Sequence, residues 1–221
     1  MARAAPISAE DLAADRARAL QITPVSRETE ARLALLVDEL LAYSAHTNVI
    51  ARSTIPTIWT RHIADSLQLL GLAPGARRWI DLGSGAGFPG LVIACALAGE
   101  DRAEVHLVES VGKKVNFLRE AARHIGVPVQ VHHVRIEDFG KNFKGAADVV
   151  TARALAPLDR LLTLARPLLK KTTVGLFPKG QDVEAELTEA SKYWTMAADL
   201  VPSQTNPQSR IVVVRGLKRK T

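Results

Sequence analysis

A glycine-rich segment at residues 81–90 constrains the fold of this chain more than any other feature. It reads Asp-Leu-Gly-Ser-Gly-Ala-Gly-Phe-Pro-Gly and follows the apolar residues Trp79 and Ile80. Glycines at alternate positions let backbone amides approach a ligand closely and permit backbone angles that other residues avoid. A strand that runs straight into such a turn predicts an α/β fold with a nucleotide-like cofactor bound where the strand ends.

Two classes of cofactor are bound by turns of this kind. Residues 85–90 match G-x-G-x-x-G, the pattern of dinucleotide-binding proteins, and residues 81–87 match D-x-G-x-G-x-G, the pattern typical of S-adenosylmethionine enzymes. The second match is longer and adds a carboxylate, Asp81, at the end of the strand. An acid repels a pyrophosphate but suits the sulfonium and ammonium groups of S-adenosylmethionine. The sequence therefore favours S-adenosylmethionine as the cofactor.

The pattern of apolar residues changes at a break near residues 72–75. Residues 1–74 predict a helical extension, with helices that begin near Ser8 and Ser26 and a third over about residues 56–70. Residues 75–221 alternate between strand-like and helical runs, which predicts a Rossmann-like parallel sheet with helices on both faces. The expected strands are 79–82, 105–108, 129–134, 148–151, 173–177 and 211–214, and the expected helices are 90–98, 111–124, 157–169 and 181–194.

Charge is distributed unevenly along the chain. The whole sequence has 29 basic and 23 acidic residues, but residues 1–74 have a net charge of −1 and residues 75–221 a net charge of +7. A basic region around a cofactor site favours a polyanionic partner such as a nucleic acid. The basic tail at residues 215–220 is expected to be a solvated end of the chain.

The remaining bulk features predict a soluble, cytoplasmic protein, and we expect it to be a monomer. Cys95 is the only cysteine and the six histidines have no metal-ligand spacing, so we expect neither an intramolecular disulfide nor a metal site. The apolar run at residues 91–98 is too short to cross a bilayer, and the N-terminal residues lack the features of a signal peptide. With 221 residues, 47% of them hydrophobic, the chain can bury the core of a medium-sized domain.

Four residues at the ends of expected strands have side chains suited to a cofactor or a substrate. Glu109 ends the second strand, where an acid commonly holds the two ribose hydroxyls. Ile136 stands at the end of the third strand and is expected to pack on the adenine base. Arg153 and Lys179 follow the fourth and fifth strands and are expected near the reacting end of the cofactor. Lys114, on the helix after Glu109, is expected to face solvent.

Several further motifs have a characteristic order and spacing. They are Thr47-Asn48-Val49-Ile50, Trp59-Thr60-Arg61-His62-Ile63-Ala64-Asp65-Ser66, the turn at 81–90, Glu109-Ser110 with Lys113-Lys114 and Phe117-Leu118-Arg119, Arg135-Ile136-Glu137-Asp138-Phe139, Asp148-Val149-Val150-Thr151-Ala152-Arg153-Ala154, and Lys179-Gly180. From about Leu33 to Val214 the chain resembles the bacterial 16S ribosomal RNA guanine-N7 methyltransferases, historically called glucose-inhibited division protein B. Two departures, Val49 after Asn48 and Phe177-Pro178 before Lys179, concern the RNA-facing rim rather than the cofactor motifs.

The resemblance implies a class I S-adenosylmethionine-dependent methyltransferase sheet preceded by a helical portion. It implies transfer of a methyl group from S-adenosyl-L-methionine to N7 of a guanine in 16S ribosomal RNA, guanine 527 in the 530 loop. The partner would be this RNA or the small ribosomal subunit. The expected cofactor-binding residues are Asp81, Gly83, Gly85, Gly87, Phe88, Glu109, Ile136, Glu137 and Arg153. Arg153 and Lys179 are assigned to the catalytic site, and Arg61 and His62 to the RNA-facing rim.

The chemistry of N7 methylation demands little from the side chains. Guanine N7 has an available lone pair at neutral pH and no proton to lose, so a general base is not required and alignment is the main task. Three other interpretations stay open at this point. They are a nicotinamide-dependent oxidoreductase, a methyltransferase for small molecules, and an RNA-binding module with a vestigial cofactor site.

Overall fold

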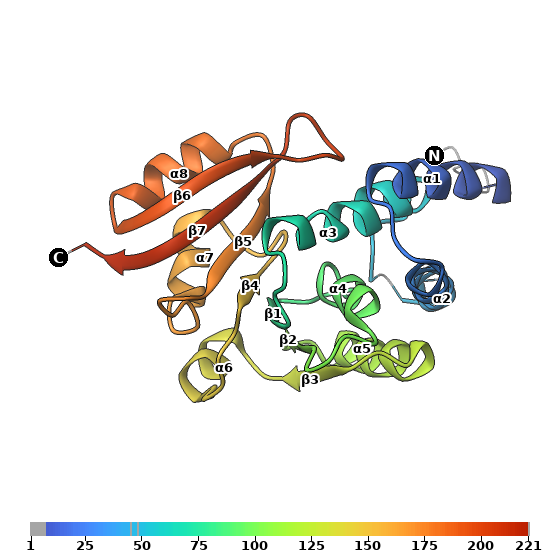
Figure 1. The fold of residues 1–221 in the computed structure, drawn as a ribbon, viewed down its shortest axis with the longest axis horizontal. Helices are drawn as coiled ribbons and strands as arrows, with labels where there is room; N and C mark the ends of the chain where they lie inside the picture. Colours follow the sequence, from blue (N-terminus) through green and yellow to red (C-terminus); the bar gives the residue numbers. More distant parts are fainter. Residues whose placement is uncertain (1–7, 45, 48, 221) are drawn as a thin grey trace.

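The computed structural model describes residues 8–44, 46–47 and 49–220, so Asn48 of the motif at 47–50 lies outside the described residues. Its centre is a seven-stranded sheet with the order β3-β2-β1-β4-β5-β7-β6 (Figure 1). The first five strands pair in parallel, whereas β7 runs antiparallel to both β5 and β6. The strands are β1 Arg78–Leu82, β2 Glu104–Glu109, β3 Val129–His133, β4 Val149–Thr151, β5 Val174–Lys179, β6 Trp194–Pro202 and β7 Arg210–Arg219.

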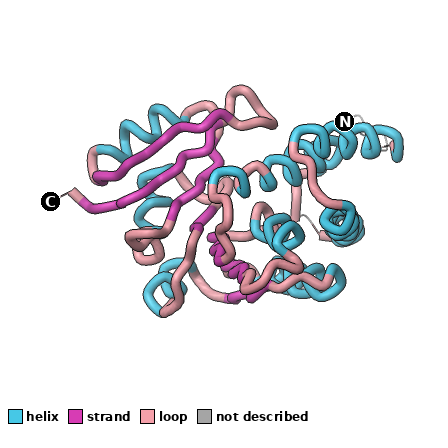
Figure 2. Tube along the Cα trace, viewed as in Figure 1, coloured by secondary structure: helices cyan, strands magenta, loops and turns pink. Residues whose placement is uncertain are grey.

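Helices cover both faces of this sheet, as the coloured tube in Figure 2 shows. The α-helices are α1 Ala9–Ile22, α2 Arg27–Ser44, α3 Asp65–Leu67, α4 Gly90–Leu97, α5 Gly112–Ile125, α6 Ile136–Asn142, α7 Leu158–Ala165 and α8 Val183–Ser191. Between α2 and β1 lie the 3-10 turns η1 Arg52–Thr57 and η3 Leu70–Leu72 and the π-helical turn η2 Trp59–Ala64. No helix in the described part of the chain is long and apolar enough to span a bilayer.

Alternate side chains of the central strands enter two separate hydrophobic clusters, one on each face of the sheet. In β1, Trp79 packs in the cluster that contains α2, α4 and α5, and Ile80 packs in the cluster that contains α7 and α8. Both side chains are buried because parallel strands in such a sheet are covered on both faces. Leu33 and Leu36 of α2 belong to the first cluster, so the N-terminal helices share a core with the sheet. The domain division near residue 74 stays a prediction.

All six expected strands are present, but the sequence missed β6. The helix expected at 181–194 ends at Ser191, and the chain then forms β6 from Trp194. β6 lies at the edge of the sheet; Trp194 is buried, and residues 195–200 alternate between exposed and half-buried. Its Ala-Ala-Asp segment has low strand propensity, so pairing with β7 decides the conformation. The basic tail is mostly exposed, as expected for a solvated end, but it is an ordered strand, because β7 continues to Arg219.

The single helix expected over residues 56–70 is broken into shorter turns. Trp59, Ile63 and Leu67 are buried as its apolar stripe predicted, but the backbone passes through the π turn η2 before the short helix α3. The Asp15 carboxylate of α1 accepts hydrogen bonds from the backbone of Trp59 at 2.8 Å and of Thr60 at 3.2 Å. This long-range cap fixes η2 beside α1, and neither its partner nor the π turn has a signature in the local sequence.

Candidate active site

The glycine-rich turn leaves β1 with three glycines in the left-handed region of backbone space. The φ angles are +71° at Gly83, +58° at Gly85 and +92° at Gly87, which residues with a side chain rarely adopt. The turn is held to the neighbouring strand because the backbone amides of Gly83 and Ser84 donate to the Val108 carbonyl at 2.9 and 3.1 Å. The sequence was therefore right that this segment forms a tight turn at the carboxyl edge of the sheet.

Replacing Gly87 by alanine should strain the turn in two ways. The left-handed backbone disfavours any side chain, and a Cβ atom would lie 2.5 Å from Leu91 Cδ1. Gly99 is a matched control, since its φ is +100° but nothing described lies within 4 Å of its Cβ position. We expect Gly99→Ala to destabilise the protein by about 1 kcal/mol and Gly87→Ala by about 2–4 kcal/mol. Thermal unfolding measures both, and equal losses would contradict the role given to Leu91.

Asp81 lies beneath the turn and does not line either of the cavities described below. Its side chain is buried, and Oδ2 accepts a hydrogen bond from the Gly90 amide at 3.1 Å. Oδ1 has no hydrogen-bond partner among the described residues. Burial raises the pKa of Asp81 from 3.8 to about 7. In this structure the carboxyl group therefore holds the end of the turn where α4 begins.

The raised pKa of Asp81 predicts a pH-dependent stability. A group that binds its proton more tightly when folded stabilises the protein at low pH and loses that contribution as pH rises through its folded pKa. The free energy of unfolding should therefore fall by about 2–4 kcal/mol between pH 4 and pH 7 through this residue. Denaturant titrations of wild type and Asp81→Asn across this range measure the two free energies of unfolding. As the pH rises, the variant should become more stable relative to wild type. Parallel curves would contradict a buried, protonated Asp81.

Glu109 closes the turn from the neighbouring strand. Its Oε2 accepts from the Gly85 amide at 3.0 Å, and its Oε1 accepts from the amides of Ser110 and Val111, both at 2.8 Å. The side chain is buried, yet it lines a cavity of about 350 Å³ on the side of the turn toward α6. Carboxylate oxygens accept more than one hydrogen bond, so Glu109 retains capacity for a ligand in that cavity.

A larger cavity of about 750 Å³ lies next to the smaller one. Gly83, Lys114 and Ala154 line both, so the two cavities are neighbours at the carboxyl edge of the sheet. Ala154 has a φ of +52°, a rare conformation for a residue with a side chain. Strain of this kind is concentrated at functional sites. Lys114, which was expected to face solvent, is half-buried and lines both cavities from α5.

Ile136 and Glu137 line the smaller cavity, as expected for the adenine end of a cofactor. The sequence interpretation placed them at the tip of a strand, whereas they begin helix α6. Phe88 lines the larger cavity together with Gly85 of the turn. Gly87 lines neither cavity and packs against Leu91 instead.

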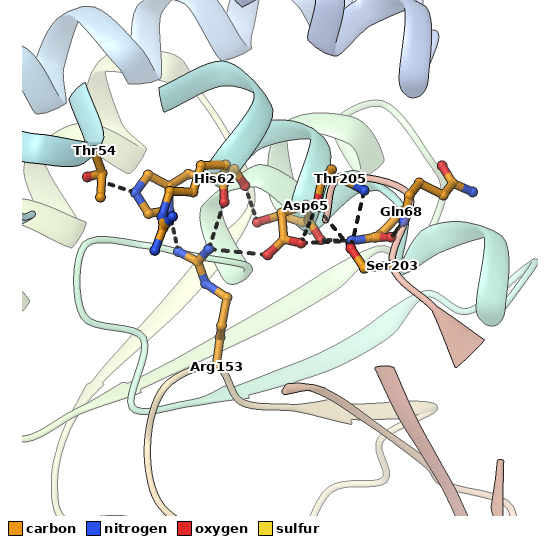
Figure 3. Close-up of polar contacts among 10 residues, drawn as sticks. Thr54, His62, Asp65, Gln68, Arg153, Ser203 and Thr205 are labelled. Atoms are coloured by element: carbon orange, nitrogen blue, oxygen red, sulfur yellow. Dashed lines mark hydrogen bonds and ion pairs between the residues drawn. The ribbon is translucent and has the colours of Figure 1, made fainter. Parts of the chain in front are cut away.

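Arg153 connects the loop after β4 to the N-terminal part of the chain. Its guanidinium donates to the Arg61 carbonyl at 3.1 Å and to Asp65 Oδ2 at 3.3 Å, and its Nη2 lies 2.7 Å from His62 Nδ1. Figure 3 shows the Arg153 side chain extending upward, with its guanidinium group between His62 and Asp65. The guanidinium carbon also lies 5.3 Å from the centre of the Phe88 ring. Arg153 is therefore held from several sides within the larger cavity.

His62 is a neutral acceptor in this arrangement. Burial, reinforced by the positive charges of Arg153 and Arg61, lowers the pKa of His62 to about 3. Its ring stacks on Phe88, with ring centres 4.7 Å apart and planes inclined by 12°. Since the imidazole is unprotonated throughout the physiological range, Nδ1 accepts a hydrogen bond from Arg153. His62 therefore links the glycine-rich turn to Arg153.

Lys179 lines the larger cavity but is already paired. Its Nζ lies 2.6 Å from Glu186 Oε2 and donates to the Ala156 carbonyl at 2.9 Å, and the side chain is only 12% exposed. The same Glu186 oxygen accepts from the Leu158 amide at 2.7 Å. This ammonium group fixes the loops after β4 and β5 against α8, which limits its reach into the cavity.

Sequence reasoning missed one wall of the larger cavity, the loop between β6 and β7. Ser203, Thr205, Asn206 and Ser209 of this loop line the cavity together with Arg210, the first residue of β7. Thr205 Oγ1 donates to Asp65 Oδ1 at 2.8 Å, so Asp65 contacts both this loop and Arg153 (Figure 3). The polar run Ser-Gln-Thr-Asn-Pro-Gln-Ser at residues 203–209 marks a loop in the sequence, but its position next to Asp65 depends on the antiparallel β6–β7 pair.

Solved structures show the fold class. The chain is similar to an SAH-bound methyltransferase of Podospora anserina, with a TM-score of 0.63, 13% identity and coverage of 97% of this chain and 99% of that one. It is also similar to an O-methyltransferase of Bacillus cereus in complex with SAH, with a TM-score of 0.60, 14% identity and coverage of 94% and 99%. The sheet and its helices thus have the class I S-adenosylmethionine-dependent methyltransferase fold that the sequence predicted.

Relatives of known name define the family. The chain is 55% identical to the ribosomal RNA small subunit methyltransferase G of Bradyrhizobium sp. strain BTAi1, over 97% of both chains. It is 56% identical to the protein of the same name from Nitrobacter hamburgensis, over 94% of this chain and 80% of that one. A family model described as rRNA small subunit methyltransferase G matches residues 29–212. This chain therefore belongs to the rRNA small subunit methyltransferase G family.

Proposed function

We propose that this protein transfers a methyl group from S-adenosylmethionine to N7 of a guanine in 16S ribosomal RNA. The observation that carries the proposal is the pair of adjacent cavities beside the glycine-rich turn, which share Gly83 and Ala154 in their linings. A cofactor and a base can thus approach each other from two sides. Family membership supplies the RNA as the substrate, and the resemblance described above points to guanine 527 in the 530 loop.

The smaller cavity offers groups that suit S-adenosylmethionine. Two carboxylates line it, Glu109 at the end of β2 and Glu137 at the start of α6, together with the cations Lys114, Arg135 and Arg160. Glu109 is positioned to accept hydrogen bonds from the ribose hydroxyls, and Ile136 offers an apolar surface to the adenine ring. When bound, S-adenosylmethionine supplies an electrophilic methyl group on a sulfonium. Asp81 and Gly87 would act indirectly, by holding the turn.

The larger cavity has room for a nucleobase next to Phe88 and Arg153. Its side chains offer little general base capacity, since the pKa of His62 is lowered to about 3 and Asp65 is paired with Arg153. N7 of guanine needs no base, because it carries a lone pair and no proton. We therefore assign Arg153 to the alignment of the cofactor and the base. His62 and Lys179 would hold the walls of the cavity, and Arg61 would face the RNA.

The working state of the enzyme is part of the same proposal. We propose a monomer in the cytoplasm that needs no metal ion and consists of a methyltransferase domain at residues 75–221 with a helical extension at residues 1–74. Analytical ultracentrifugation of the purified protein tests whether it is a monomer. Activity after exhaustive treatment with a chelator tests the metal requirement, and full activity is the expected result. Loss of activity that returns with an added metal would contradict it.

The direct test uses small-subunit RNA from cells that lack the enzyme. The purified protein and S-adenosylmethionine are incubated with this RNA, and N7-methylguanine is located by chemical cleavage. We expect one new cleavage site, in the 530 loop. Modification of a different atom or of no atom would overturn the proposal. Parallel titrations with S-adenosylmethionine and with NAD should give binding of the first alone, and binding of NAD would favour the oxidoreductase interpretation.

A further inference from the structure

Six cationic residues line the larger cavity, and two of them, Arg153 and Lys179, are paired with carboxylates. We call the other four the cationic rim: Arg18, Arg61, Lys114 and Arg210. They come from α1, η2, α5 and the start of β7, so distant parts of the sequence supply them. Arg18 and Arg61 are exposed, and Lys114 and Arg210 are half-buried. Only Arg61 was expected in this role from the sequence.

The cationic rim has no acidic partner among the described residues. Two carboxylates line the same cavity, and each is paired with another cation, Asp65 with Arg153 at 3.3 Å and Glu186 with Lys179 at 2.6 Å. None of the four rim side chains forms an ion pair in the described part of the chain. The mouth of the cavity therefore presents uncompensated positive charge.

The position of Arg210 in the rim is fixed by a polar network. Its Nη1 donates to the carbonyls of Pro207 at 2.7 Å and Ser209 at 2.9 Å, which leaves its other guanidinium hydrogens available. The loop that precedes it is anchored to the helical segment before β1, because Gln68 accepts from the Gln204 amide at 2.9 Å and donates to Ser203 Oγ at 3.2 Å. Arg210 is thus presented to the cavity by a loop with defined contacts.

We infer that the cationic rim binds the backbone phosphates of a single RNA strand on both sides of the target guanine. This inference rests on the proposed function. N7 lies on the edge of guanine that the deep major groove of A-form RNA hides from side chains, so the target must be in an unpaired or opened segment. A nucleotide turned into the cavity leaves its flanking phosphates at the mouth, where the rim side chains lie. Phosphates would supply the negative charge that the rim lacks.

Exposed basic residues outside both cavities provide a matched control. In the antiparallel β5–β7 pair, Arg210 lies opposite Lys179, at the end of β7 next to the larger cavity. Lys218 and Arg219 lie at the opposite end of the same strand. Together with the exposed Arg166 they are two arginines and one lysine outside both cavities. The rim variant is Arg18→Gln, Arg61→Gln and Arg210→Gln. The control variant, Arg166→Gln, Lys218→Gln and Arg219→Gln, makes the same change in net charge.

The test measures binding of small-subunit RNA from cells lacking the enzyme as a function of salt concentration. Each phosphate contact to single-stranded RNA contributes about 0.7 to the slope of log Kd against log salt, so the rim variant should lose about 2 from the slope. The control variant should keep the wild-type slope. In methylation assays the rim variant should raise KM for RNA at least about 30-fold and keep kcat within a few-fold. Its Kd for S-adenosylmethionine and its melting temperature should match wild type.

The outcomes separate this inference from the proposed function. If wild type methylates the RNA but the rim and control variants have equal slopes, the rim inference is overturned and the proposed function stands. If wild type binds RNA with a slope that depends on the rim but methylates nothing, the rim inference stands and the proposed function falls. Failure of wild type to bind the RNA at any salt concentration would overturn both.

Discussion

Arg153→Ala is expected to lower kcat/KM for RNA methylation by at least about 100-fold. Its guanidinium contacts His62, Asp65 and the Arg61 carbonyl and lies over the Phe88 ring, so its removal frees the walls of the larger cavity to shift. A misplacement of about 1 Å between reacting groups can cost about 100-fold in rate, which corresponds to about 2.7 kcal/mol in the activation barrier. Steady-state kinetics with RNA measure the loss of kcat/KM, and calorimetric titration with S-adenosylmethionine measures any change in cofactor affinity separately.

The conservative variant Arg153→Lys shows whether geometry or charge matters at this position. Lysine keeps the positive charge but replaces a planar fork of donors by one ammonium group, which cannot reach His62 and Asp65 together. We therefore expect its kcat to lie close to that of Arg153→Ala. Recovery of wild-type kcat by lysine would indicate that charge alone matters. Unchanged methylation and cofactor affinity in Arg153→Ala would remove this residue from the site.

Glu109→Ala should weaken S-adenosylmethionine binding by about 100-fold. Two hydrogen bonds from ribose hydroxyls to a carboxylate would each contribute about 1.5 kcal/mol or more, so losing both costs about 3 kcal/mol. The same change removes the acceptor for the amides of Gly85, Ser110 and Val111, which should lower the free energy of unfolding by about 1–3 kcal/mol. Calorimetric titration and denaturant unfolding measure these losses on one sample.

Glu137→Ala is the matched control for the loss of a carboxylate from the smaller cavity. Glu137 lines that cavity, but its side chain is exposed and accepts no hydrogen bond from the described backbone. We expect its removal to weaken cofactor binding by less than about 10-fold and to leave stability unchanged within about 0.5 kcal/mol. If Glu109→Ala bound the cofactor as tightly as wild type, the assignment of Glu109 to the ribose would be wrong.

Elements whose conformation depends on neighbours in the sequence were predicted well. β1, β2, β4 and β5 are short, mainly apolar runs because helices cover both faces of the sheet, and such runs are recognisable without a structure. The turn at residues 83–87 was predicted because its three left-handed backbone positions are glycines. Glu109 was predicted because it follows directly after an apolar strand. In each case the decisive physical requirement falls on residues close together in the chain.

Elements that depend on distant partners were missed or misassigned. β6 exists because it pairs with β7, and η2 is capped by Asp15, 44 residues before Trp59. Asp65 was given no role because its partners are distant in the chain: Arg153 is 88 residues away and Thr205 is 140 residues away. Lys114 was assigned to solvent because nothing near it in the sequence indicates the cavity that its side chain reaches.

The sequence by itself determined the fold class, the cofactor turn and the acid that faces it, because backbone conformation and strand burial leave a local pattern. Only the tertiary structure decided how Asp65 connects Arg153 to the loop before β7, and which four cations form the cationic rim of the larger cavity. Those residues come together through packing of α1, η2, α5 and the β6–β7 pair around the end of the sheet. The free energy of that packing is spread over the whole core, so no short segment of the sequence records it.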